Sequence, residues 1–111
     1  MIFINSPFDI LDKAFHNLYP EKTYKACIDL NMKDEKGKTV YGYTQFTKDD
    51  VPVIAISADL SIKDAVEIFA HELAHVAAGE GEGHSKIWEK EFDKIYDEYH
   101  RVGDEMFGGR R

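Results

Sequence analysis

The spacing of hydrophobic residues changes along the chain and predicts helices at both ends with strands between them. Apolar residues recur three or four positions apart between Ser6-Pro7 and Pro20, which predicts a first helix. Ser6 can cap free amides, and a proline at the first helical position gives up no needed hydrogen bond. From Tyr24 to Lys33 apolar and polar residues alternate, the pattern of a half-buried strand. A turn at 34–37 and a β-rich run over 39–47 then predict the second arm of a hairpin.

A third strand is predicted over the short apolar run from Val51 to Ser57. Pro52 has no N–H to donate to a neighbouring strand, and proline within a sheet is largely confined to edge strands. The sequence therefore predicts that this strand lies at the edge of the sheet.

The second half of the chain is predicted to be helical. Apolar residues at helical spacing follow Ser61 and continue through Ala78, which indicates one amphipathic helix. The segment 79–83 contains three glycines and is expected to be a loop. A second amphipathic helix is predicted over 85–101, and the residues from 103 to 111 are expected to form a mobile tail.

This order of elements predicts an α+β fold. The expected architecture is an N-terminal helix, a three-stranded and largely antiparallel sheet, and two C-terminal helices. With 111 residues, the chain is expected to form a single domain spanning 1–111.

Composition and charge exclude several classes of protein. The chain carries a net charge of -7, which argues against direct binding to nucleic-acid phosphates. No apolar stretch approaches the roughly 20 residues that cross a bilayer, and the N-terminus lacks the features of a signal peptide. A single cysteine, Cys27, cannot form an internal disulfide and favours a reducing compartment. A cytoplasmic protein without membrane contact is therefore expected.

The first C-terminal helix contains the sequence His71-Glu72-Leu73-Ala74-His75, which matches the HExxH pattern. Residues four apart lie one turn apart on the same face of a helix, so two imidazoles can bind one metal ion. Glu72 is rotated by about 100° from His71 and can reach a water molecule on that metal. The two histidines also point away from the apolar stripe of the helix, toward a possible cleft.

A third histidine, His84, follows the glycine-rich loop at the start of the next helix. The loop allows the chain to reverse and to bring His84 near the first two histidines. Three histidines with a fourth position open to water are typical of catalytic zinc sites. Carboxylates offer alternative third ligands, either from the loop or from the last helix: Glu80, Glu82, Glu89, Glu91 and Asp93. Asp93 could instead orient one of the histidines.

The HELAH sequence, together with Gly83-His84 and the aromatic-bearing helix that follows, resembles the SprT-like zinc metallopeptidases and their WLM and YgjP-like relatives. This resemblance covers about 61–99. It implies a minimal zincin-like fold, one Zn²⁺ per chain bound by His71, His75 and His84, and Glu72 as the catalytic residue. It also implies that an edge strand binds the substrate, for which Val53, Ile54 and Ala55 are the matching residues.

The expected activity is zinc-dependent hydrolysis of a peptide or protein substrate. Zinc lowers the pKa of its bound water, and Glu72 accepts a proton as that water attacks the peptide carbonyl. Glu72 then delivers the proton to the leaving amine. Four residues of the last helix are candidate oxyanion donors: Tyr96, Tyr99, His100 and Arg101. The alternative function is a catalytically silent, zinc-stabilised protein-binding module.

Overall fold

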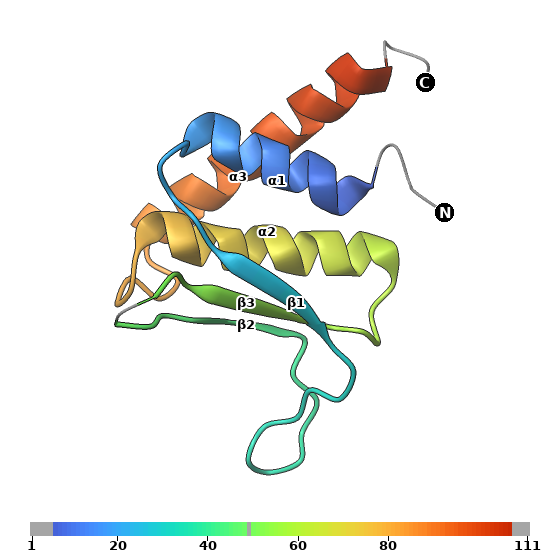
Figure 1. Cartoon of the computed structure of the whole chain (residues 1–111), viewed down its shortest axis with the longest axis vertical. Helices are drawn as coiled ribbons and strands as arrows, with labels where there is room; N and C mark the ends of the chain where they lie inside the picture. The colour runs from blue at the N-terminus through green and yellow to red at the C-terminus, as the bar shows by residue number, and fades with distance from the viewer. Residues whose placement is uncertain (1–5, 49, 108–111) are drawn as a thin grey trace.

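The computed structural model describes residues 6–48 and 50–107. Along the chain, the elements are α1 (Pro7–Leu18), β1 (Lys25–Asp29), β2 (Gly42–Gln45), β3 (Val53–Ser57), α2 (Ile62–Ala78) and α3 (Lys86–Phe107). Figure 1 shows the sheet at one side of α2, with α1 and α3 at the other side. The α+β class and the helices predicted from the hydrophobic spacing are therefore confirmed.

The order of strands in the sheet differs from the prediction. The order is β1-β3-β2, so β3 is the central strand. It pairs in parallel with β1 and antiparallel with β2. The prediction of an edge strand over Val51 to Ser57 is therefore wrong. Pro52 lies just before β3, and its carbonyl accepts from the N–H of Lys25 at 2.9 Å. Its missing N–H is therefore not needed for the pairing with β1.

The predicted hairpin between the first two strands is also wrong. The turn itself forms, and Asp34 accepts hydrogen bonds from two backbone N–H groups in it. Pairing beyond the turn is limited, in the described part of the chain, to one isolated antiparallel bridge between Lys33 and Thr39. The two strands then separate and pair with opposite edges of β3. The sheet is therefore mixed rather than largely antiparallel.

The core lies between the helices and the sheet. Its largest fully buried side chains come from all three helices and from the central strand: Leu11, Phe15, Ile54, Leu73 and Ile95. The strand β3 is buried along most of its length because it has a neighbour on each side. This packing holds α2 against the sheet and fixes the orientation of its opposite face.

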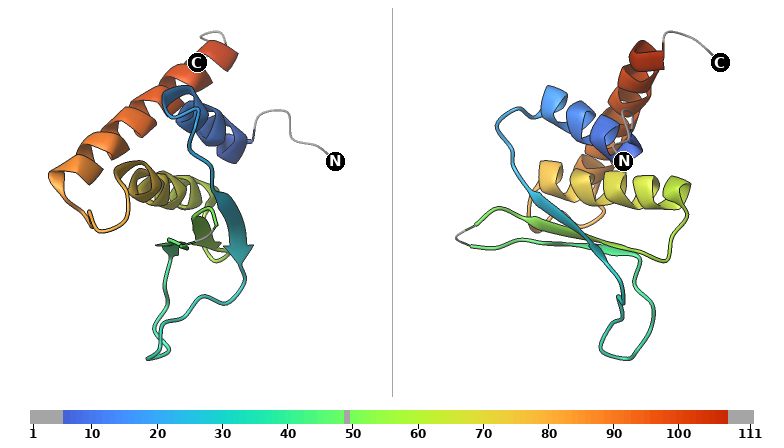
Figure 2. Two further views of the ribbon diagram at one scale, coloured as in Figure 1. Left: turned by 60° about the vertical axis from the view of Figure 1, so that its left-hand side comes forward. Right: turned by 45° about the vertical axis from the view of Figure 1, so that its right-hand side comes forward.

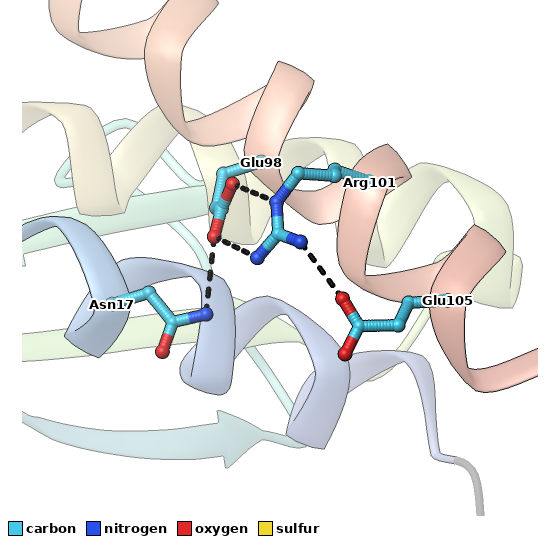
Figure 3. A network of polar contacts seen from close by, with 4 residues as sticks. All are labelled: Asn17, Glu98, Arg101 and Glu105. Carbon is cyan, nitrogen blue, oxygen red and sulfur yellow. Dashed lines mark hydrogen bonds and ion pairs between the residues drawn. The ribbon is translucent and has the colours of Figure 1, made fainter.

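The last helix is longer than the sequence analysis predicts. It continues through 103–107, so this part of the expected mobile tail is helical, while 108–111 lies outside the described residues. A hydrogen bond joins α1 to α3: the side-chain amide of Asn17 donates to Glu98, whose carboxylate also accepts two hydrogen bonds from Arg101 of α3 (Figure 3). None of the described helices is both long and apolar enough to span a bilayer.

Candidate metal centre

The helix α2 provides the first two histidines of the site. It begins at a cap in which the side-chain oxygen of Ser61 accepts from the N–H of Asp64 at 3.1 Å. Its buried stripe faces the core, which leaves His71 and His75 half-buried on another face of the helix. Their ring centroids lie 5.2 Å apart, as expected for residues one turn apart.

The loop between α2 and α3 brings the third histidine to the same place. Gly79 ends α2 with a φ of 100°, and its N–H donates to the carbonyl of His75 at 2.9 Å. Gly83 has a φ of 56°, a conformation that glycine adopts without a steric penalty. These reversals place the ring centroid of His84 4.9 Å from that of His71 and 5.0 Å from that of His75.

The nitrogen atoms of these three rings are spaced for one metal ion. One available ligand atom from each of His71, His75 and His84 lies within 4.8 Å of the other two. The Nε2 atoms of His71 and His84 are 2.9 Å apart. Tetrahedral zinc with Zn–N bonds of about 2.0–2.1 Å requires nitrogens about 3.3 Å apart. Small side-chain adjustments therefore suffice for a cation to fit among the three histidines.

The surroundings favour the neutral form of the histidines, which is the form that binds metal. Burial lowers the pKa of His71, and the neighbouring His84 lowers it further. Burial and the two other histidines together lower the pKa of His75 to about 4. Both side chains are therefore neutral at pH 7.

Glu72 lies beside the histidines but is held differently. Its side chain is only 6% exposed, and its Oε1 accepts a hydrogen bond of 2.8 Å from the hydroxyl of Thr44 on β2. Burial raises the pKa of the carboxyl group, whereas the bond from Thr44 and the charge of His84 oppose that change. A carboxylate with a raised pKa is suited to accept and return a proton near neutral pH.

Trp88 forms a wall of the site. Its indole N–H donates to the backbone carbonyl of His71 at 3.2 Å. Its ring centroid is 4.7 Å from that of His71 and 4.8 Å from that of His84. These contacts give Trp88 a role in positioning the histidines.

A cavity of about 400 Å³ opens at the histidines. It is lined by the histidine cluster, the loop glycines and strand β2: Gly42, Tyr43, Thr44, Phe46, His71, Glu72, His75, Gly79, Gly81, Gly83 and His84. A second cavity of about 410 Å³ also reaches His71, and Tyr41 and Phe92 are among its lining residues.

Thr44 and Gly42 are the site residues that the sequence analysis misses. Both lie on β2, roughly thirty positions before the HExxH motif, and no local pattern connects the two segments. The substrate residues suggested by the resemblance, Val53 to Ala55, lie instead on the central strand, where β1 and β2 already occupy both sides. That part of the predicted site is a consequence of the incorrect strand order.

The carboxylates considered as alternative third ligands do not join the cluster. Among the described residues, the three histidines are the one group of histidine, cysteine or acidic side chains spaced to hold a metal. Glu82 accepts from the Ser85 hydroxyl at 3.3 Å, and Glu91 contacts Tyr19 and Lys94. Arg101, considered as an oxyanion donor, is bound to carboxylates of its own helix.

Comparison with known proteins supports the fold of this chain. No protein-family model matches the sequence, and no curated protein sequence matches it. The structure is similar to the crystal structure of the metallopeptidase zymogen of Pyrococcus abyssi abylysin, with a TM-score of 0.57 and 20% sequence identity over 94% of each chain. The chain therefore shares the overall fold of that protein, and its three clustered histidines are spaced to hold a metal ion.

Proposed function

We propose that this protein is a zinc-dependent metallopeptidase of SprT-like character. The observation that carries the proposal is the cluster of His71, His75 and His84 with the buried Glu72 beside it. The similarity of the fold to a metallopeptidase zymogen supports the same class of activity. The proposed cofactor is one Zn²⁺ per chain, bound by the three histidines.

Bound zinc would supply a Lewis acid that polarises a carbonyl group and increases the acidity of water. Glu72 acts as the general base and then as the general acid that protonates the leaving amine. The hydroxyl of Thr44 donates to Oε1 of Glu72, so Oε2 is the oxygen that accepts and returns the proton. Trp88 fixes the position of His71 through its backbone carbonyl.

The substrate is proposed to bind along the outer edge of β2. The carbonyl of Tyr41 accepts from the N–H of Ser57, so the backbone groups of Tyr41 point toward β3. Because these groups alternate along a strand, those of Gly42 and Thr44 point to the outer edge. Both residues also line the cavity at the histidines. A peptide can add to such an edge through main-chain hydrogen bonds, with little selectivity for sequence.

The proposed location is the cytoplasm, and the proposed partners are peptide or protein substrates rather than nucleic acid. The thiol of Cys27 is free and exposed, which suits a reducing compartment. The net charge of -7 disfavours contact with nucleic-acid phosphates.

The proposal is tested by Glu72→Gln, which keeps the shape of the side chain but removes its ability to exchange a proton. We expect wild-type zinc content and a loss of at least about 100-fold in the rate of peptide cleavage. Glu35→Gln, on the exposed turn after β1, is the matched control and should retain full activity. Cleavage by Glu72→Gln at the wild-type rate would contradict the role of Glu72. Zinc binding without cleavage of any peptide in a broad library would favour the zinc-stabilised binding module.

A further inference from the structure

The strand β1 offers a second edge of the sheet, far from β2. In the strand order β1-β3-β2, β1 is an outer strand, and Figure 2 shows it at one margin of the sheet. Among residues 6–48 and 50–107, no strand pairs with its outer edge. Such an edge presents unpaired N–H and C=O groups that another strand can bind.

The hydrogen bonds to β3 show which residues of β1 face outward. Lys25 donates to the carbonyl of Pro52, and the carbonyl of Asp29 accepts from Ala58, so both residues direct their backbone toward β3. Because backbone direction alternates along a strand, Ala26 and Ile28 direct their N–H and C=O groups to the open edge. A pairing strand must therefore meet these two residues.

Apolar surface lies next to this edge. Ile28 is 55% exposed and Leu30 is 81% exposed, although both belong to the apolar half of the alternating run. An apolar cavity of about 400 Å³ lies between α1 and β1, and Ile28 lines it together with Phe8, Ile56 and Phe69, among others. A hydrophobic side chain from a pairing strand could be buried there.

We propose that a second copy of this chain pairs antiparallel with β1, about a two-fold axis at Cys27. In this register Ala26 lies opposite Ile28 of the second copy, and Ile28 lies opposite its Ala26. Both are outward-facing residues, so the two pairs exchange four backbone hydrogen bonds. The two sheets then form one continuous sheet of six strands. Each copy places its Ile28 near the apolar cavity of the other.

Charge complementarity supports the choice of a second copy as the partner. The strand sequence is Lys-Ala-Cys-Ile-Asp, with opposite charges at equal distances from Cys27. The two-fold axis therefore sets Lys25 opposite Asp29 of the second copy, and does so twice. Opposite charges on directly facing residues stabilise a sheet pair, whereas like charges destabilise it. Lys25 also contacts Asp50 of its own chain at 3.1 Å, and its ammonium group retains donors for a second carboxylate.

The first test reverses one charge and then restores the complementarity. At 100 µM protein and about physiological salt, we expect sedimentation equilibrium to give wild type a mass twice the 12.7 kDa of one chain. Asp29→Lys sets lysine opposite lysine and should weaken the dimer about tenfold. The double variant Lys25→Asp/Asp29→Lys should recover it, with circular dichroism confirming that each variant is folded. A wild-type mass of one chain, or an unchanged dimer in Asp29→Lys, would overturn the proposal.

The second test uses Cys27 as a reporter of the register. On the two-fold axis, the two Cys27 residues form a non-hydrogen-bonded pair with Cα atoms about 4.5 Å apart, within the range that a disulfide spans. Under mild oxidation with copper-phenanthroline, wild type should cross-link at least about tenfold faster than Cys27→Ser/Lys36→Cys. That control carries one exposed thiol on the turn after β1. Equal rates would overturn this register, as would protection of the Cys27 thiol in a monomeric protein.

Discussion

Gly42 lies where β2 packs against Ile68 of α2, and Gly42→Ala is predicted to destabilise the protein. A Cβ at this position would lie 2.5 Å from Cγ2 of Ile68 and 3.3 Å from the carbonyl oxygen of Ala55. Non-bonded carbon atoms prefer about 3.5–4.0 Å, so Ile68 would have to move by about 1 Å. Isoleucine in a helix is largely confined to one χ1 rotamer, so β2 and α2 would have to separate instead.

The expected cost follows from two opposing effects. Inserting a methyl group into a packed contact costs about 1–3 kcal/mol, while replacing glycine stabilises by about 0.4–1 kcal/mol through the unfolded chain. The net loss is therefore about 1.5 kcal/mol. The matched control is Gly103→Ala in α3, where a Cβ would meet nothing within 4 Å. That substitution should stabilise the protein by about 0.5–1 kcal/mol.

Urea denaturation in excess EDTA, followed by circular dichroism, measures both effects without a contribution from metal. With an m value of about 1.5 kcal/mol/M, the midpoint should fall by about 1 M for Gly42→Ala and rise by about 0.5 M for Gly103→Ala. In the background of Ile68→Ala, which removes Cγ2, Gly42→Ala should cost much less. Equal stability of Gly42→Ala and wild type, or the same cost in both backgrounds, would refute this reasoning.

Three further predictions concern polar contacts. Thr44→Val removes the hydrogen bond to Glu72 and should lower kcat about tenfold at unchanged zinc content, with Thr44→Ser close to wild type. Arg101 lowers the pKa of Glu98, so this pair stabilises the fold above about pH 4.3, the usual pKa of glutamate, and loses that effect on acidification. Glu98→Gln should therefore cost up to about 1 kcal/mol at pH 7 and nothing near pH 2, as urea titrations at both pH values can show. Burial raises the pKa of Tyr24 well above its usual value. Tyr24→Phe should therefore remove, from the alkaline absorbance titration, one phenol that ionises at higher pH than the others. It should also move alkaline unfolding to higher pH.

The helices and the histidine site could be predicted because their signals are local. The apolar spacing of α2 determines its buried face, so the same pattern that predicts the helix also predicts which way His71 and His75 point. His84 follows within ten residues, and glycines in the connecting loop make the reversal possible. The metal-binding geometry therefore depends on little outside 62–88.

The strand order could not be predicted in the same way. Alternation and turn residues identify β1 and β2 but do not reveal that β3 inserts between them, because that choice depends on packing against α2. Pro52 favours an edge position on sequence grounds, yet it contributes to the pairing with β1 only through its carbonyl, which accepts from the N–H of Lys25. The same long-range packing brings Thr44 to Glu72, which explains why this partner of Glu72 is absent from the sequence-based site.

The central expectation is that His71, His75 and His84 hold one metal ion, and the zinc content of matched variants tests it most directly. Wild type, His84→Ala and the control His100→Ala, whose side chain is exposed on α3, should be purified identically and analysed by elemental mass spectrometry. We expect about one zinc per chain in wild type and in His100→Ala, and far less in His84→Ala, because zinc would lose one of its three protein ligands. Equal zinc in wild type and His84→Ala, or no zinc in any of the three proteins, would contradict the account.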